Sequence, residues 1–358
     1  MKISPANRAR APGIQAPAMV TFPINPKFAR TATFCPVNKN FCHYPLARSS
    51  AVAPPWRATS RKTRRFCVLH RQSENRKALV TVSLSASTLA KQPDLERLPS
   101  RFDLGLLLRL TALTALAQSE ERHRRALEAG RKRIKATDPK AREYTRLIAP
   151  GAYDQTSWQA EVAGEVKLEF KSLRFLLQCL GRSPDASTNR AAVRESLRLW
   201  SVLNVRYCQW YEKGDKEDKR FGPFIEYLKM PDAGRGPVII RLSQDYMATI
   251  SRRKGYFLKV PLPLPLASEA ALNLSLFLPL FDRTPPPKGK SPVYEFAAVC
   301  DRLGIAGDES WRRYERLGKA MDAVNKHLKC SSSRKRYGIK SLDEIRIRFV
   351  EHRIQCQR

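Results

Sequence analysis

Acidic residues are scarce in this sequence. Its 358 residues contain 33 Asp and Glu against 66 Lys and Arg, which leaves a formal net charge of +33 at pH 7. A surface of this charge attracts polyanions, because their binding releases condensed counterions. The composition therefore favours nucleic acid as the partner, with an anionic membrane surface or a basic surface kept for solubility as the alternatives.

Long hydrophobic runs are also missing. The richest stretch, residues 104–116, is interrupted by Arg109 and Thr111 and is shorter than the ~20 apolar residues that span a bilayer. The eight cysteines follow no regular spacing, and no secretory signal opens the chain. We therefore expect a soluble, cytoplasmic protein with reduced thiols and no membrane span.

Recognisable catalytic motifs are absent as well. The five histidines never lie within two or three positions of one another, which argues against the metal-binding His pair of tyrosine nickases. The string PPPKGKS ends like a phosphate-binding loop, but Thr284 stands where the first glycine is needed. Residues of zinc-ligating type occur at spacings of no standard zinc finger: Cys35, Cys42, His43, Cys67 and His70. We expect no enzyme activity, no cofactor and no metal site.

Residues 1–100 differ in composition from the rest of the chain. They hold 11 of the 25 prolines and only three acids, without sustained periodicity. Such a composition is typical of disorder, so we expect a disordered, basic, Pro-rich extension. An organellar transit peptide and a translation start further downstream are the alternatives.

Periodic patterns begin at Phe102 and predict a first folded unit. The expected elements are a helix over 102–117, extended or followed by a second one over 118–143, a strand over 165–170, helices over 171–181 and 189–204, and strands over 205–212, 223–228 and 237–242. Gly181 ends the shorter helix, and SPDAST supplies capping residues before the longer one. This order of helix, strand, helix, helix and hairpin is that of the winged helix. In this fold, the second helix of the helix-turn-helix enters the major groove of DNA.

A second copy of that order follows a connector over 255–268, whose alternating prolines exclude a central strand. Its expected elements are a helix over 268–281, a strand in SPVYEF, helices over 295–303 and 310–328, and a hairpin of 337–339 with 344–351. The predicted fold class is α+β, mainly helical, with two tandem winged-helix domains. We expect the extension at 1–100, the domains at 101–254 and 268–358, and the Pro-rich connector at 255–267.

Basic side chains gather at the positions that read DNA in this arrangement. In the helix over 310–328, an apolar face of Tyr314, Leu317, Met321, Val324 and Leu328 lies opposite a basic one. In the helix over 189–204, arginines recur every fourth residue, beside an apolar stripe of Val193, Leu197 and Trp200. The predicted wing-tip loops are basic too, although loops are often charged merely because they are exposed. The candidate DNA-binding residues are Thr188, Asn189, Arg190, Arg194, Arg198, Lys216, Lys219, Arg220, Arg312, Arg313, Arg316, Lys319, Arg334, Lys335 and Arg336.

Several passages resemble the plasmid replication initiators of the RepA and TrfA type, which carry tandem winged helices. They are KSLRFLLQCLG with NRAAVRESLRLWSVLNVRY, PVIIRLSQDYMATI, SEAALNLSLFL, YEFAAVCDRLGI and WRRYERLGKAMDAVNKHL, within about 200 residues from Glu161 onward. The resemblance implies sequence-specific binding to double-stranded DNA at repeated origin sites, initiation of plasmid replication, a switch between a repressing homodimer and an initiating monomer, and recruitment of a host initiator and helicase. Residues 1–100 match nothing in the pattern.

Two other functions stay open. A winged-helix transcriptional repressor has the same fold, and a non-specific nucleic-acid or RNA-binding protein has the same charge. The aromatic residues available for stacking on bases are Trp210, Tyr211, Trp311 and Tyr314. We expect them in cores, which disfavours a single-strand binder.

Overall fold

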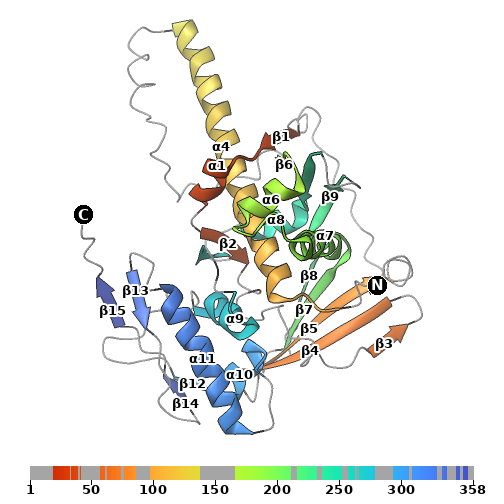
Figure 1. Ribbon diagram of the computed structural model, residues 1–358, viewed down its shortest axis with the longest axis vertical. Helices are drawn as coiled ribbons and strands as arrows, with labels where there is room; N and C mark the ends of the chain where they lie inside the picture. Colours follow the sequence, from red (N-terminus) through yellow and green to blue (C-terminus); the bar gives the residue numbers. More distant parts are fainter. Residues whose placement is uncertain are drawn as a thin grey trace, which may run out of the picture.

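The chain forms a mixed α+β structure with more helix than strand, gathered around two hydrophobic cores (Figure 1). The computed structural model describes residues 19–32, 34–38, 41, 57–60, 63–73, 76–85, 97–137, 166–210, 216–231, 236–251, 257–262, 264, 266–278, 293–305, 309–328, 333–336, 344–346 and 350–353. In this part of the chain, no helix is both long and apolar enough to cross a membrane.

A four-stranded sheet forms one side of the first core. Its strands follow the order β1 (Val20–Pro23), β6 (Val166–Phe170), β10 (Val238–Leu242) and β9 (Ile225–Lys229). β1 pairs with β6 in parallel, and the other pairs are antiparallel. Burial alternates along β6 and β10, because successive side chains of a strand point to opposite faces. Both strands contact the long central helix α4 (Arg101–Thr137).

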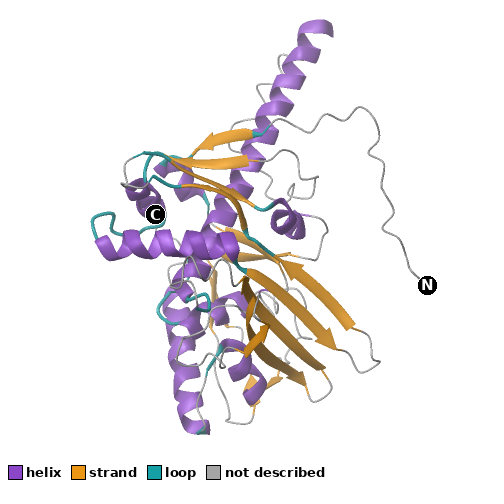
Figure 2. Ribbon diagram, turned by 90° about the vertical axis from the view of Figure 1, so that its right-hand side faces the viewer, coloured by secondary structure: helices purple, strands orange, loops and turns teal. Residues whose placement is uncertain are grey.

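Helices surround α4 and close the first core. They are α1 (Pro26–Thr31), α6 (Leu173–Cys179), α7 (Ser187–Val202) and α8 (Gln244–Ser251). Between Leu104 and Ala117, α4 is apolar on nearly all sides and mostly buried, as expected for a helix packed on every face. Its later turns extend away from the rest of the described chain (Figures 1 and 2). This single helix covers the segment predicted over 102–117 and most of the segment predicted over 118–143.

The first hundred residues contribute strands, where the composition predicts disorder. β3 (Arg57–Ser60), β4 (Thr63–Ser73) and β5 (Arg76–Ser85) join β7 (Asn204–Trp210) and β8 (Lys216–Phe221) in a five-stranded antiparallel sheet of order β3-β4-β5-β7-β8. Figure 2 shows this sheet below the four-stranded one. Another strand, β2 (Phe34–Asn38), pairs with β11 (Phe257–Pro261) of the predicted connector. Long-range pairing orders these segments, and composition does not reveal it.

The second core lies among α9 (Glu269–Phe277), α10 (Phe296–Leu303) and α11 (Ser310–Leu328). The helix predicted over 310–328 is confirmed with those bounds. β12 (Val293–Glu295) pairs with β14 (Glu344–Arg346), and β13 (Ser333–Arg336) pairs with β15 (Val350–Arg353). The strand predicted in SPVYEF is confirmed as β12. Ser333–Arg336 pairs with the last strand, and residues 337–339 of the predicted hairpin lie outside the described residues.

The positions of the hairpins differ from the prediction in the first unit. β7 and β8 form a hairpin, but this hairpin joins β5 and not β6. The strands that continue the sheet of β6 are β10 and then β9. The hairpin that follows α7 in the winged-helix order and shares the sheet of β6 is therefore β9–β10.

Candidate nucleic-acid interface

Helix α7 has a buried inner face and a charged outer face. Its predicted stripe of Val193, Leu197 and Trp200 is fully buried, because it packs against α4 and α6. Arg190 and Arg198 are exposed and form no ion pair within the described part of the chain. Guanidinium groups placed in this way are free to reach phosphates or base edges.

The beginning of α7 follows a short turn from α6. Gly181 ends α6 at φ 70, in the left-handed region, and the amide of Arg182 donates to the carbonyl oxygen of Leu177 over 2.9 Å. Thr188 is exposed, whereas the Nδ2 atom of Asn189 donates to the Ser183 carbonyl oxygen over 3.1 Å. Asn189 therefore stabilises the turn, and reading a base would require it to exchange this bond.

Arg194 differs from Arg190 and Arg198 in its surroundings. It is half-buried, and its Nη2 atom lies 3.5 Å from the carbonyl oxygen of Pro231, which follows β9. This contact joins α7 to the β9–β10 hairpin. Arg194 thus helps to hold the hairpin next to the helix, where Arg190 and Arg198 face outward.

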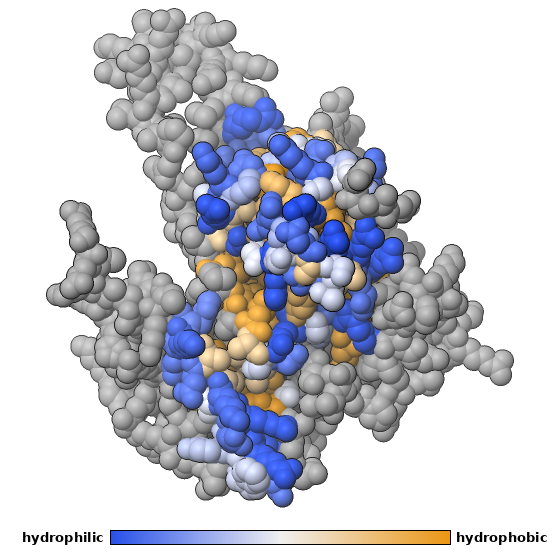
Figure 3. Space-filling model, in the orientation of Figure 1, coloured by the Kyte–Doolittle hydropathy of each residue, from blue (hydrophilic) through white to orange (hydrophobic). Residues whose placement is uncertain are grey.

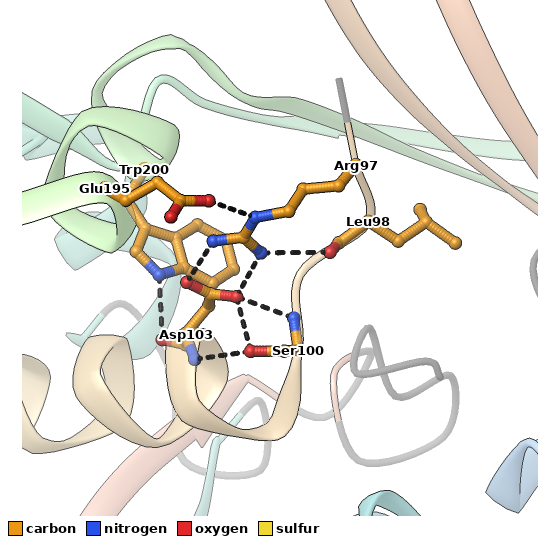
Figure 4. A network of polar contacts seen from close by, with 6 residues as sticks. All are labelled: Arg97, Leu98, Ser100, Asp103, Glu195 and Trp200. Atoms are coloured by element: carbon orange, nitrogen blue, oxygen red, sulfur yellow. Dashed lines mark hydrogen bonds and ion pairs between the residues drawn. The ribbon is translucent and has the colours of Figure 1, made fainter. Parts of the chain in front are cut away.

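A partly buried ion-pair network connects α7 to the start of α4 (Figure 4). The two Nη atoms of Arg97 donate to the Asp103 carboxylate at 2.5 and 3.0 Å, and its Nε atom donates to Glu195 of α7 at 2.6 Å. Ser100 adds its amide and hydroxyl to Asp103, and the Trp200 indole donates to the Asp103 carbonyl oxygen over 2.8 Å. Glu195 therefore binds Arg97, and not an arginine of its own helix.

The pKa values in this network follow from its charges. Burial alone would raise the pKa of Asp103, but the hydrogen bonds and charge of Arg97, with the bonds from Ser100, lower it. Burial opposes the charge of Arg97 in the same way, and Asp103 and Glu195 outweigh that cost and raise its pKa. The Asp103 carboxylate and the Arg97 guanidinium therefore remain charged at neutral pH.

Helix α11, like α7, has a buried apolar face and an exposed charged face. Leu317, Met321 and Val324 are buried in the second core, which confirms the predicted inner face at these positions. Four basic residues are exposed away from this inner face: Arg312, Arg316, Lys319 and Lys326. Arg313 is half-buried and lies four residues before Leu317, on the side of the core. Gly304 ends the preceding helix α10 at φ 73, as Gly181 ends α6.

Local acids already bind two of these basic side chains. Arg312 lies 2.9 Å from Glu309, and Lys319 lies 2.6 Å from Glu315. Both pairs are exposed, and exposed pairs contribute little to stability. DNA phosphates are therefore able to displace the acids at low cost.

Two aromatic residues at the start of α11 correct the prediction that they lie in a core. Trp311 is 58% exposed and Tyr314 is 37% exposed, and the guanidinium of Arg312 lies 5.2 Å from the Trp311 ring centroid. Helical spacing alone places Tyr314 on the inner face, but this residue lies in the first turn of α11 and is not part of the second core. Trp210 and Tyr211 lie outside the residues whose side chains are described.

The basic residues predicted in wing-tip loops lie in strands instead. Lys216, Lys219 and Arg220 belong to β8, and Arg334, Lys335 and Arg336 belong to β13. Arg220 is exposed. The other five side chains are outside the described set, so their contribution to a DNA surface stays a prediction.

Aromatic and charged residues of β6, β9 and β10 lie together on one side of the four-stranded sheet. The ring of Tyr227, which is 38% exposed, lies under the Lys167 ammonium group at 4.4 Å. Arg241 pairs with Glu226 at 2.9 Å. Only the strand partnership of β9, β10 and β6 brings these residues together, and no local pattern marks them.

Metal-ligating side chains do not cluster among the described residues. Of the cysteines and histidines weighed as zinc ligands, Cys35 alone has a described side chain. It is fully buried and its Sγ atom donates to the Leu108 carbonyl oxygen over 3.0 Å, so it is a core residue. Cys42, His43, Cys67 and His70 lie outside the described side chains.

No protein-family model matches the chain, and no curated protein is similar to it in sequence. Two solved structures of RctB are weakly similar to it. The crystal structure of selenomethionine derivatives of RctB domains 2 and 3 has a TM-score of 0.40 and 13% identity, over 86% of this chain and 97% of that one. A second structure of RctB domains 2–3 has a TM-score of 0.32 and 10% identity, over 85% of each chain.

Proposed function

We propose that the protein binds double-stranded DNA with α7 and α11 as its two reading helices and initiates plasmid replication at repeated origin sites. The observation that carries the proposal is the repeated design of these helices. Each follows a short helix ended by a glycine with positive φ, buries an apolar face and exposes arginines on the other. Two such helices in one chain are able to enter the major groove at two neighbouring places.

The winged-helix interpretation places the first wing at β9–β10. In that fold the strand before the helix-turn-helix shares a sheet with the hairpin after it, as β6 does with β10 and β9. In the second unit β12 lies beside β14.

The proposal predicts two kinds of contact with DNA. A side chain that pairs with a base edge discriminates between sequences by about 1–3 kcal/mol. A side chain that pairs with a phosphate contributes equally to every duplex, and its loss lowers the salt slope by about one unit. We assign Arg312 and Arg316 to bases and Lys335 to phosphate.

The test is a fluorescence anisotropy titration of the full chain, because the first core includes residues from Ile24 onward. Repeated DNA from near the protein's own gene is compared with a scrambled duplex over a salt series. We expect a preference of ~10³ or more with a steep salt slope. Arg316→Gln reduces the preference, while Lys27→Gln, which removes one exposed charge from α1, leaves it in place. A preference near one refutes sequence-specific binding.

Initiation is separated from repression by a replication assay. A plasmid that carries the repeats and lacks its own initiator gene is supplied with the chain in trans. We expect the plasmid to be maintained, and to be lost with Arg316→Gln. Specific binding without maintenance identifies a transcriptional repressor with the same DNA-reading helices.

Binding to single-stranded nucleic acid is a second candidate function, favoured by the exposed Trp311 and Tyr314. Bases stack on exposed aromatic rings for about 1–3 kcal/mol each, with little sequence preference. Trp311→Ala decides between the two: it weakens binding to an oligothymidine strand at least tenfold if stacking dominates, and it leaves the duplex preference intact if α11 reads a groove.

A further inference from the structure

A pocket of about 340 Å³ opens where α4, α6 and the segment between β11 and α9 meet. Figure 3 shows one face of the molecule, with apolar side chains exposed in its middle and hydrophilic ones above and below. The pocket wall is mostly apolar, and its apolar residues are Ala32, Phe102, Gly105, Leu106, Leu180, Gly181, Leu262, Leu264 and Leu266. Its volume lies within the range of small-ligand sites.

Gly105 and Leu266 shape the floor of the pocket. A β-carbon at position 105 would lie 3.1 Å from the Cδ2 atom of Leu266, so the glycine lets the connector approach α4 closely. Leu266 is only half-buried, as are Leu262 and Leu264. These three leucines line an accessible apolar surface that a ligand is able to cover.

Three arginines complete the described part of the lining, which contains no acid: Arg30, Arg109 and Arg182. Arg109 is half-buried and donates to the carbonyl oxygens of Ala32 and Ala29 at 2.9 and 2.5 Å. It forms no ion pair with an acid of the described chain, and burial lowers its pKa. Arg182 packs over the Phe102 ring at 5.4 Å, and Arg30 is exposed at the pocket.

We propose that this pocket binds a small amphipathic anion, with a carboxylate held among the three arginines and an apolar body on the leucines. A purely apolar ligand would desolvate the guanidinium groups without pairing them, which is costly. A bare inorganic anion would leave the apolar wall uncovered. A carboxylate on a short alkyl chain satisfies both parts, because charge-assisted bonds to arginine are strong and each buried methylene adds to affinity.

The probe is octanoate, titrated calorimetrically into the full chain at constant ionic strength. We expect one site. Hexanoate binds about fifteenfold more weakly, because each methylene is worth ~0.8 kcal/mol, or about fourfold. Octan-1-ol, which has the chain without the charge, binds at least tenfold more weakly, and sulfate does not displace octanoate. Equal binding of octanoate and octan-1-ol, or displacement by sulfate, overturns the proposal.

Three variants separate this pocket from general attraction of anions to a basic chain. Leu264→Trp fills the pocket and abolishes octanoate binding, and Arg182→Gln weakens it about tenfold or more. Lys229→Gln removes the same charge from the exposed edge strand β9 and leaves binding unchanged. If Lys229→Gln loses as much affinity as Arg182→Gln, the pocket is not the site. Should Leu264→Trp fail to fold, as judged by circular dichroism, the two charge variants decide.

Discussion

Replacing Asp103 by Asn tests how much the ion pair between Arg97 and the start of α4 stabilises the fold. The Asp103 side chain is fully buried and Arg97 is 30% exposed, so their bidentate pair lies largely away from water. Asn has nearly the same size but carries no charge and has one acceptor oxygen in place of two. The variant therefore leaves the guanidinium of Arg97 with Glu195 as its single acidic partner.

The expected cost follows from the burial of the pair. Removing one partner of a buried ion pair typically destabilises a protein by about 3–5 kcal/mol. The remaining bond of Arg97 to Glu195 and its partial exposure favour the lower end, so we expect a loss of about 3 kcal/mol. With a urea m-value of about 3 kcal/mol per molar, the midpoint of unfolding falls by about 1 M.

The assay is urea unfolding of the full chain, followed by tryptophan fluorescence and circular dichroism. Glu195→Gln is the matched control, because it breaks the more exposed bond of the same arginine. An exposed pair contributes about 0–1 kcal/mol, so this control shifts the midpoint by less than ~0.3 M. Equal shifts for the two variants, or a shift below 0.2 M for Asp103→Asn by the same scale, refute the idea that Asp103 anchors the network.

The same pair predicts a pH dependence of stability. Because the folded-state pKa of Asp103 is lowered, its contribution is complete above the unfolded-state pKa of about 3.9 and is lost as the pH falls through the folded-state value. The difference in unfolding free energy between the natural chain and Asp103→Asn is thus full near pH 7 and shrinks below about pH 4. A difference that stays constant down to pH 2.5 contradicts the assignment of charge to this carboxyl.

Three further substitutions probe local parts of the fold. Gly222→Ala lowers the thermal midpoint more than Gly181→Ala, because a β-carbon at 222 lies 2.4 Å from a backbone carbonyl oxygen whereas at 181 it meets nothing within 4 Å. Leu317→Ala destabilises the second core by about 3 kcal/mol, measured by hydrogen exchange of α11 amides. Trp200→Phe keeps a buried aromatic ring but loses the bond to the Asp103 carbonyl oxygen, which costs about 1–2 kcal/mol in urea unfolding.

Helices with a strong apolar stripe are the part of this fold that the sequence predicts well. Val193, Leu197 and Trp200 repeat at helical spacing and are fully buried, and the glycines that end α6 and α10 adopt the expected positive φ. These features depend on interactions between residues a few positions apart. Local patterns therefore predict α7, α10 and α11, and with them the places of the exposed arginines.

Strand partnerships are the part that the sequence does not predict. Composition suggests disorder before residue 100. Nevertheless, β5 pairs with β4 on one side and with β7 on the other, and β7 lies more than a hundred residues further along the chain. Val82 and Leu84 of β5 are buried in the first core. The prolines around β2 and β11 argue against a central strand. These two segments instead pair with each other in a two-stranded sheet, which tolerates prolines that a central strand excludes.

The candidate site combines both cases. The helices that carry Arg190, Arg198 and Arg316 are recognisable from their periodicity, whereas the hairpin beside α7 is identified only by the pairing of β10 with β6. A wing is defined by the sheet it extends, and basic loop composition does not reveal that sheet. Lys216 and Lys219, chosen for their loop-like setting, lie instead in a strand whose partner is β7. The proposed DNA surface is therefore best tested first on α7 and α11, whose exposed residues follow from local geometry, and then on β9 and β10.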